Sequence, residues 1–349
     1  MKACVIRGAR QLSVETYPDP SPGAGEVVIA FGAGGICGSD LHYYKDGGVG
    51  DFKLREPMIL GHEVAGTVVT IGSGVTKVST GDRVAVNPSR TCGVCAQCRD
   101  GRSNLCSEVR FFGSAARFPH VSGGFSEFIV AAESQCVPFG PSMSFRTAAC
   151  SEPLAVALHA VEKAGRSLVG TRVLICGAGP IGLLVALAAR FAGAMEIVVT
   201  DLAQQALDAA HANFGVDFAL NVRDDADKIA SFGAGTGTFD VAFEASGSAA
   251  ALNTCLSVVR PGGRIVQVGM FAPGPVNNLT IGRLISREIE LVGTFRFHGE
   301  FEKAVRLLER RRILVDPLLT ASAPLSAAPD AFELALDRSR SLKVSLLPD

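Results

Sequence analysis

The stretch RVLICGAGPIGLLVALAARFAGAMEIVVTD, residues 172–201, decides the fold. It contains an apolar run, a glycine-rich turn, an apolar helical pattern and a second apolar run that ends in Asp201. The glycines follow the pattern Gly177-x-Gly179-x-x-Gly182. In such a unit the first glycine permits the turn, the second lets backbone approach a pyrophosphate, and the third lets the helix pack on the strand. The stretch therefore predicts the beginning of a dinucleotide-binding α/β sheet.

The position of Asp201 separates this interpretation from its alternative, a glycine-rich turn in a sugar- or methyl-transfer fold. Asp201 lies 19 residues after Gly182, where a carboxylate would hold the ribose hydroxyls of a dinucleotide. A carboxylate there accepts hydrogen bonds from a 2′-hydroxyl and repels a 2′-phosphate. The following residues, LAQQALD, contain no arginine. The sequence therefore favours NAD as the cofactor, with NADP as the second choice.

The pattern on either side of this stretch divides the chain into two domains. From about residue 155 to 292, apolar strands alternate with helices of ten or more residues, which indicates a parallel sheet covered on both faces. Residues 1–154 consist of short apolar runs cut by glycine and proline, which is typical of a mainly β domain. Residues 293–349 return to short β-like pieces. We expect a doubly wound Rossmann domain, 155–292, inserted into a mainly β catalytic domain, 1–154 and 293–349.

The composition excludes several functional classes. The net charge of −1 and the pI of about 6.6 leave no basic footprint for nucleic acid. The uncharged run Val173–Ala189 contains three glycines and a proline, so it predicts a strand, a turn and a helix and not a membrane span. The four-residue apolar stretch after Lys2 is too short for a signal peptide. We therefore expect a cytoplasmic protein with no membrane partner.

Four of the ten cysteines, Cys92, Cys95, Cys98 and Cys106, lie within 15 residues of one another. A disulfide framework belongs to small secreted chains, whereas this spacing in a polar loop suits four thiolates around one metal ion. Four thiolates close the shell of a tetrahedral zinc, so the site would be structural. An iron–sulfur cluster is the alternative, because it also takes four thiolates.

A second, open metal site is suggested by three fragments: GGICGSDLHYY with Cys37, LGHEVAG with His62 and Glu63, and SEPLAVALHA with Glu152. Each fragment alone is ambiguous, because a lone cysteine is usually a core residue and a His–Glu pair is usually structural. Together they form a mixed sulfur, nitrogen and oxygen ligand set. Such a set suits a catalytic zinc that keeps one position open for water or substrate.

Taken in order, these motifs resemble the zinc-containing medium-chain dehydrogenase/reductase superfamily over essentially the whole chain. The likeness is to the polyol branch, because Glu152 stands where alcohol dehydrogenases have a second cysteine ligand. The fragments RFFGSAARFPHVSGGF, SQCVP, NTCLSVVRPGGRIVQVGM and GTFRF are similar to those of bacterial L-idonate 5-dehydrogenases. One departure is Ala206, where the family often has an arginine that contacts the adenosine.

The resemblance implies roles for individual residues. Cys37 and His62 would be zinc ligands, and the third protein ligand would be Glu63, Glu152, or each in turn. Ser39 would take the proton of the substrate hydroxyl, His42 would pass it on through the cofactor ribose, and Asp40 would orient His62. The residues implied to line the substrate pocket are Tyr43, Phe112, Glu152 and Arg296. Those implied to pack on the dinucleotide are Ile181, Val268, Met270 and Phe295.

The expected reaction is the NAD-linked oxidation of a secondary hydroxyl, with an aldonate such as L-idonate as substrate and 5-keto-D-gluconate as product. Arg110 and Arg117 flank Phe112 and are candidate partners for the aldonate carboxylate. A neutral polyol, sorbitol or xylitol, is the alternative substrate. A dinucleotide-binding protein without activity is a remote alternative, since Cys37, Ser39, His42 and His62 are all present. By analogy with polyol relatives we expect a homotetramer.

Overall fold

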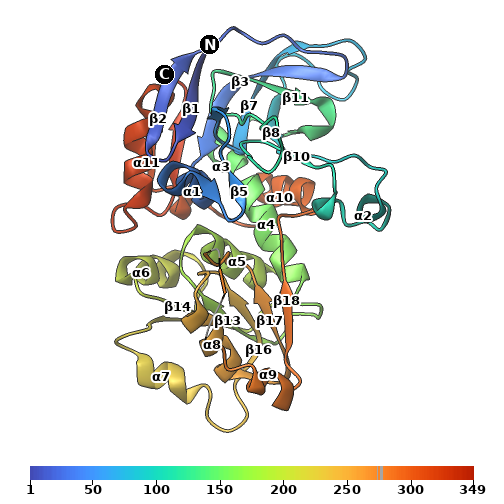
Figure 1. Cartoon of the computed structure of the whole chain (residues 1–349). Helices are drawn as coiled ribbons and strands as arrows, with labels where there is room; N and C mark the ends of the chain where they lie inside the picture. Colours follow the sequence, from blue (N-terminus) through green and yellow to red (C-terminus); the bar gives the residue numbers. More distant parts are fainter. Residues whose placement is uncertain (273, 276–277) are drawn as a thin grey trace. The chain divides into compact units, whose positions relative to one another are not determined.

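The structure is a computed structural model that describes residues 1–272, 274–275 and 278–349. The chain divides into two compact units (Figure 1). Unit 1 comprises Met1–Pro153 together with His298–Asp349, and unit 2 comprises Leu154–Phe297. A parallel α/β sheet occupies unit 2 and mainly β structure occupies unit 1, which confirms the predicted fold class.

Unit 2 is built on a six-stranded parallel sheet. Its strands are β13 (Arg172–Cys176), β14 (Glu196–Asp201), β15 (Phe218–Asn221), β16 (Phe239–Glu244), β17 (Val259–Gln267) and β18 (Glu290–Gly293). Their order is β15-β14-β13-β16-β17-β18, and each neighbouring pair is parallel. The direction of winding reverses between β13 and β16. In sheets of this kind ligands bind outside the carboxyl ends of the strands at that reversal.

Helices connect these strands as the helical periodicity predicted. The helices are α4 (Ser151–Glu162), which crosses the boundary between the units, α5 (Pro180–Phe191), α6 (Gln204–Asn213), α7 (Ala226–Ser231), α8 (Ala249–Val258) and α9 (Gly282–Ser286). Helix α5 begins with Pro180 at its first position, where the absent N–H of proline costs nothing. Leu252 and Leu256 of α8 join Leu174 and Ile265 of the sheet in one buried apolar cluster.

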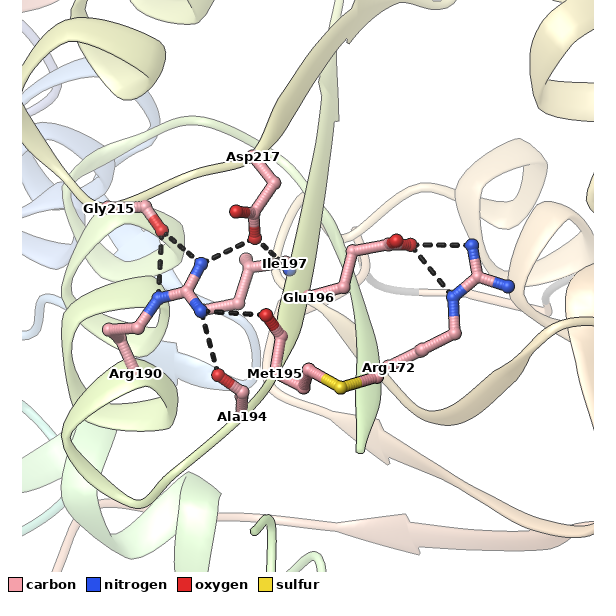
Figure 2. Close-up of polar contacts among 8 residues, drawn as sticks. All are labelled: Arg172, Arg190, Ala194, Met195, Glu196, Ile197, Gly215 and Asp217. Carbon is pink, nitrogen blue, oxygen red and sulfur yellow. Dashed lines mark hydrogen bonds and ion pairs between the residues drawn. The ribbon is translucent and has the colours of Figure 1, made fainter. Parts of the chain in front are cut away.

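Two arginines secure the amino ends of the first strands of this sheet (Figure 2). Arg190, near the end of α5, donates to the carbonyl oxygens of Gly215 (2.7 and 3.1 Å), Ala194 (2.8 Å) and Met195 (3.0 Å) and pairs with Asp217. Arg172 of β13 pairs with Glu196 of β14 at 2.6 Å. These contacts fix the loops before β14 and β15, at the opposite end from the glycine-rich turn.

Unit 1 contains a seven-stranded sheet and a smaller three-stranded sheet. In the larger sheet the strands are β3 (Glu26–Gly35), β7 (Glu63–Ile71), β8 (Arg83–Val86), β11 (Phe128–Ala132), β12 (Cys136–Pro138), β19 (Ala321–Pro324) and β20 (Val344–Leu347). In the smaller sheet they are β1 (Lys2–Gly8), β2 (Gln11–Thr16) and β6 (Met58–Ile59). The order in the larger sheet is β12-β8-β7-β3-β20-β19, and β11 also pairs with β3.

The remaining elements of unit 1 are short. The strands among them are β4 (Gly48–Val49), β5 (Phe52–Lys53), β9 (Ser89–Arg90) and β10 (Arg110–Phe111). The α-helices are α1 (Gly38–Asp46), α2 (Ala96–Arg99), α3 (Phe145–Ala149), α10 (Glu300–Glu309) and α11 (Ala328–Leu336), and the 3-10 turns are Ser103–Leu105, Glu133–Gln135, Asp316–Leu318 and Leu325–Ala327.

The C-terminal strand β20 is the element that most affects the site. It pairs antiparallel with β3, with Leu346 opposite Gly34 and Ser345 opposite Gly35. This brings the last residues of the chain beside Ile36 and Cys37, which directly follow β3. No helix in the described ranges is long and apolar enough to cross a membrane.

Candidate active site

Cys37 stands at the junction of β3 and α1, where it is the N-cap residue of the helix. Its backbone is extended, with φ −97° and ψ 158°, and its N–H donates to Asp40 Oδ2 at 3.0 Å. Asp40 therefore acts as the acidic partner of a capping box and holds the start of the helix in place. Burial, followed by the charge of Glu63, raises the pKa of the Cys37 thiol to about 12. The thiol is protonated before a metal arrives and must release its proton to bind one.

His62 and Asp40 lie together behind this cysteine. Asp40 Oδ1 accepts the N–H of Gly61 at 3.3 Å and lies 3.7 Å from His62 Nδ1. Asp40 is fully buried and His62 is nearly so. Burial raises the pKa of Asp40, and the charge of a protonated His62 opposes that shift. The carboxylate thus faces one ring nitrogen of His62, which is the arrangement that orients a metal-binding histidine.

Glu63, the first residue of β7, is engaged by a lysine from the end of the chain. Lys343 Nζ lies 2.7 Å from Glu63 Oε1 and 2.5 Å from Oε2, and it also donates to the carbonyl of Ile36 at 3.1 Å. A Cβ on Gly35 would come within 2.2 Å of Glu63 Oε2 and 2.9 Å of Lys343 Cε. Residue 35 must therefore be glycine for this buried ion pair to fit.

The ligand atoms of Cys37, His62 and Glu63 lie within 4.8 Å of one another. Sulfur, nitrogen and oxygen donors in one buried cluster fit zinc, which takes all three at tetrahedral geometry. Glu152, in the first turn of α4, lies outside this set of three atoms but is buried close enough to interact with it. Burial raises the pKa of Glu152 to about 8, the charge of His62 opposes that shift, and the charges of Glu63 and Cys37 add to it.

Ser39 and His42 both lie on α1, directly after Cys37. They are three residues apart, so they share a face of the helix. His42 Nδ1 lies 3.1 Å from Asp46 Oδ2, and the His42 side chain is 61% exposed. A proton passed from Ser39 to His42 would therefore reach a group that is open to solvent.

The residues expected around the substrate are connected through the loop after β10. Tyr43 of α1 is buried, and its hydroxyl oxygen accepts the N–H of Ala115 at 2.9 Å. Phe111 packs against His62, with ring centroids 5.5 Å apart. Phe112 is half-buried against the same core as Tyr43. The loop is thus fixed to both α1 and His62.

The two arginines of this loop have different surroundings. Arg110 is exposed and precedes Phe111 on β10, so its side chain projects from the opposite face of the strand to the ring that touches His62. Arg117 Nε donates to the carbonyl of Val109 at 3.3 Å, and its Nη1 lies 3.4 Å from Glu108 Oε2. Of the two, Arg117 is the one held on the loop that Tyr43 anchors.

The four-cysteine lobe also fits zinc. All four Sγ atoms lie within 4.8 Å of one another, with Cys92 at 3.5 Å from Cys106 and 4.0 Å from Cys98. Tetrahedral zinc with bonds of about 2.3 Å would place its sulfurs about 3.8 Å apart. The backbone N–H groups of Cys95 and Glu108 donate to the sulfurs of Cys92 and Cys106, both at 3.3 Å. The four cysteines form no disulfide with one another, so all four sulfurs are available as metal ligands.

In unit 2 the glycine-rich turn lies between β13 and α5. Gly177 has φ +110°, which glycine tolerates, and a Cβ on Gly182 would come within 1.8 Å of the Gly177 carbonyl oxygen. A Cβ on Gly179, the N-cap of α5, would meet nothing within 4 Å. The open space at Gly179, with the α5 N-terminus behind it, fits a dinucleotide pyrophosphate. Ile181 lies in the first turn of that helix.

Asp201 ends β14, next to this turn. Its Oδ2 accepts the N–H of Ala178 at 2.6 Å, and its Oδ1 accepts those of Leu202 and Ala203. The carbonyl of Asp201 accepts the N–H of Val222, so Arg223 follows directly on the neighbouring strand end. The residues that follow Asp201 in sequence, LAQQALD, contain no arginine. Parallel pairing brings Arg223 to the same edge of the sheet.

The remaining predicted dinucleotide contacts lie just beyond β17 and β18. Val268 follows the last residue of β17, and Met270, 56% exposed, lies two residues further on. Phe295 lies two residues after β18, and the guanidinium of Arg296 lies 4.8 Å from the centre of its ring. These residues share the carboxyl edge of the sheet with Gly177 and Asp201.

Lys343 and Glu244 are among the buried charged residues that sequence reasoning missed. Lys343 stands in the apolar run SLKVSLL, and a lone lysine in a strand-like run was the available signal. Glu244 ends the strand FDVAFE as Asp201 ends EIVVTD, and that parallel was the signal for it. Glu244 is the last residue of β16, and Lys343 directly precedes β20.

Comparison with known proteins bears on the whole length of the chain. The L-idonate 5-dehydrogenase (NAD(P)(+)) of Escherichia coli (strain K12) is 42% identical over 346 residues, which cover 99% of this chain and 98% of that protein. The sorbitol dehydrogenase of Bacillus subtilis (strain 168) is 37% identical over 352 residues, which cover 100% and 98%. The crystal structure of L-idonate 5-dehydrogenase from Escherichia coli matches with a TM-score of 0.93 and 41% identity over 99% of this chain and 97% of that one.

Two family descriptions match consecutive parts of the chain. Residues 23–141 match the alcohol dehydrogenase GroES-like domain, and residues 180–310 match the zinc-binding dehydrogenase family. The resemblance drawn from the motifs is thereby confirmed. Because sequence and fold agree over nearly the whole length, and because two clusters of side chains suit zinc, this chain is a zinc-dependent dehydrogenase that belongs to the zinc-binding dehydrogenase family.

Proposed function

We propose that this protein oxidises the C5 hydroxyl of L-idonate to 5-keto-D-gluconate with NAD as the hydride acceptor. The observation that carries the proposal is the 42% identity to an L-idonate 5-dehydrogenase over 99% of the chain. The fragment RFFGSAARFPHVSGGF, which resembles L-idonate 5-dehydrogenases, also supports it, because its Phe111 packs against His62. The neutral-polyol alternative rests on the 37% identity to a sorbitol dehydrogenase.

In the proposed site Cys37, His62 and Glu63 hold the catalytic zinc, and Glu152 stands beside it. Glu63 is preferred to Glu152 as the third ligand because its carboxylate lies within 4.8 Å of the other two ligand atoms. Zinc supplies a Lewis acid that lowers the pKa of the substrate hydroxyl. Asp40 holds His62 in orientation, and Glu152, buried beside this cluster, is a proposed substrate contact.

The proton leaves through residues of α1. Ser39 accepts the proton of the substrate hydroxyl, and His42, whose Nδ1 lies beside Asp46, passes it on through the cofactor ribose. Tyr43, Phe112 and Arg296 are the proposed substrate contacts. Gly177, Gly179, Ile181, Gly182, Asp201, Val268, Met270 and Phe295 are the proposed contacts of the dinucleotide, which supplies the hydride acceptor.

We also propose that the protein is a cytoplasmic homotetramer. A cytoplasmic location is supported by the cluster of Cys92, Cys95, Cys98 and Cys106, which suits a metal site and not the disulfide framework of a secreted protein. Assembly is supported by the edge of the sheet in unit 2, where β18 pairs with β17 on one side within the described residues.

Steady-state kinetics tests the substrate proposal. L-idonate, sorbitol and xylitol are each compared with NAD and with NADP as cofactor. We expect kcat/KM for L-idonate with NAD to exceed that for either polyol by at least about tenfold, the ratio that one charge-assisted hydrogen bond provides. A higher kcat/KM for sorbitol would replace the proposal by its neutral-polyol alternative.

A further inference from the structure

A fully buried carboxylate lies at the carboxyl edge of the unit 2 sheet and has no place in the chemistry described so far. Glu244 ends β16, next to the reversal in strand order, and is 0% exposed. We infer that Glu244 is a positioning residue for the dinucleotide, because it sets the shape of two loops. One loop, residues 245–247, faces Gly177, and the other carries Val268 and Met270. This inference rests on the proposed use of a dinucleotide.

Every contact of the Glu244 side chain brings a donor to it. Its Oε1 accepts the N–H of Ser246 at 2.8 Å and the Ser246 hydroxyl, and its Oε2 accepts the N–H of Gly247 at 3.1 Å and an amide hydrogen of Gln267. A buried carboxylate is costly unless such donors satisfy it. Each of the two side-chain oxygens receives two donors, so both oxygens must act as acceptors. A carboxylate has two acceptor oxygens, whereas an amide has only one.

The backbone of Glu244 fixes the second loop. Its carbonyl oxygen accepts the N–H groups of Val268 and Gly269, both at 2.8 Å. Gln267, which donates to the Glu244 carboxylate, also donates to the carbonyl of Gly269 at 2.8 Å. One residue of β16 thus holds the segment 244–247 through its side chain and the segment 267–269 through both its side chain and its backbone.

The backbones of the two loops lie so close together that no Cβ atom fits between them. A Cβ on Gly269 would lie 2.2 Å from the Gly247 nitrogen, and one on Gly247 would lie 2.3 Å from the Met270 carbonyl oxygen. A Cβ on Gly177 would lie 3.1 Å from both the Ala245 carbonyl carbon and the Ser246 nitrogen. Backbone therefore meets backbone from the glycine-rich turn through residues 245–247 to residues 269–270.

It follows that a displacement at Glu244 is transmitted to both sides. The glycine-rich turn, proposed to hold the pyrophosphate, lies against Ala245 and Ser246. The loop with Val268 and Met270, proposed to hold the rest of the dinucleotide, lies against Gly247. Because binding sites tolerate displacements of only about 0.5 Å in their supporting groups, the loss of the carboxylate should weaken dinucleotide binding without touching the dinucleotide directly.

The test is the substitution Glu244→Gln in the zinc-loaded protein, with NADH binding measured by the change in NADH fluorescence. The amide keeps the volume but sets an NH2 group against donors from Ser246 or from Gly247 and Gln267. We expect the Kd for NADH and the KM for NAD to rise at least about tenfold, with kcat lowered much less. Zinc content should be unchanged, because the site of Cys37 and His62 lies in unit 1.

Asp240→Asn is the matched control. Asp240 lies at the other end of the same strand, where it accepts the N–H of Arg172 at 2.8 Å and the Nε–H of Arg260 at 2.7 Å. This variant also removes a carboxylate that receives donors on both oxygens, but far from the glycine-rich turn. We expect it to lower the melting temperature and to leave the Kd for NADH within about twofold of the wild type.

The outcomes separate this inference from the function on which it rests. Wild-type protein that binds neither NADH nor NADPH would contradict the proposed function itself. Wild-type protein that binds NADH, with Glu244→Gln equal to it in Kd, would overturn this inference alone, and so would equal losses of affinity in Glu244→Gln and Asp240→Asn.

A second pair of variants keeps the test decisive if Glu244→Gln does not fold. Ser246→Ala and Gln267→Leu each remove one donor to the carboxylate and leave Glu244 in place. Weaker NADH binding in folded protein of both variants would support the inference, and unchanged binding in both would overturn it.

Discussion

Lys343 Nζ lies 2.5 Å from Glu63 Oε2, and the two side chains are only 2% and 1% exposed. The pairing joins the last strand of the chain to a residue that shares a cluster with Cys37 and His62. Burial by itself lowers the pKa of Lys343, but the charge of Glu63 and its hydrogen bond to Lys343 act against burial, and the net shift is upward. Lys343 therefore stays charged and balances one of the negative groups at the proposed zinc site.

Lys343→Met should destabilise the zinc-free protein by about 3–5 kcal/mol, since it leaves the Glu63 carboxylate buried without a cation. The zinc-loaded protein should lose less, because a zinc ion bound by Glu63 supplies positive charge in place of the ammonium. Urea unfolding of the zinc-free and zinc-loaded forms measures both losses.

Two further variants control this prediction. Lys343→Arg keeps the charge and should cost less than Lys343→Met in the zinc-free form. The double variant Lys343→Met with Glu63→Gln removes both charges and should recover part of the lost stability. Equal losses with and without zinc in Lys343→Met would place Glu63 outside the coordination shell.

The two metal sites should differ in how readily they lose zinc. In the proposed sites, four thiolates would close the shell of a zinc bound by Cys92, Cys95, Cys98 and Cys106, whereas a zinc bound by Cys37 and His62 would keep an open position. Under mild chelation we expect one zinc to leave together with the activity and the second to remain. Elemental analysis of fresh, active protein should give two zincs per chain, and a value of one or less would contradict the assignment.

The difference can be assigned to a site by mutation. Cys37→Ser should remove one zinc and nearly all activity while leaving the fold intact. Cys98→Ser should instead lower the melting temperature, because structural zinc contributes directly to folding free energy. The reverse pattern would exchange the roles of the two sites.

Much of this fold was predictable because the decisive pattern is local. The glycines at 177, 179 and 182 are needed within one turn, and the strands and helices of unit 2 each carry their own periodicity. The four-cysteine lobe was predictable for the same reason, since its ligands lie within 15 residues. Local spacing is enough when one loop supplies every part of a site.

The contacts that could not be predicted join distant parts of the chain. Lys343 reaches Glu63 across 280 residues because β20 pairs with β3, and a pairing between segments so far apart leaves no mark in either sequence. Arg223 reaches the edge that holds Asp201 because β14 and β15 are parallel neighbours. The sequence shows which residues carry charge, but the sheet order determines which of them meet.

The position of Arg223 leads to a prediction about cofactor choice. Asp201 should favour NAD by repelling a 2′-phosphate, while Arg223 on the neighbouring strand end offers a cation to that phosphate. Arg223→Ala should lower kcat/KM with NADP at least about fivefold and leave that with NAD nearly unchanged. Asp201→Ser should shift the preference toward NADP, since Arg223 remains. A wild-type enzyme that uses NADP more efficiently than NAD would show that the repulsion from Asp201 does not decide the choice.

The exposed edge of β18 leads to a prediction about assembly. Leu291 in the middle of this strand is 40% exposed, and an unprotected apolar edge is a place where a second chain can pair. Wild-type protein should scatter light with the mass of a tetramer at micromolar concentration. Leu291→Lys should shift the mass to a smaller species. A monomeric wild type would refute the proposed assembly.

The last prediction concerns what distinguishes an aldonate from a neutral polyol. The carboxylate of an aldonate needs a cation at the end of the pocket away from the reacting hydroxyl. Arg117 is held by Val109 and Glu108 on the loop that Tyr43 anchors through Ala115, whereas Arg110 projects from the opposite face of β10 to Phe111. Arg117→Met should therefore cost roughly 1.5–3 kcal/mol of transition-state binding for L-idonate, or about ten- to a hundredfold in kcat/KM, with little effect on sorbitol.

Arg110→Met is the matched control, because it removes the same charge from the same loop region but from the other face of the strand. It should leave kcat/KM for both substrates within about twofold of the wild type. Equal losses on L-idonate and sorbitol in Arg117→Met would mean that this arginine only shapes the loop. A loss confined to L-idonate in Arg110→Met would mean that the strand presents its other face to the substrate.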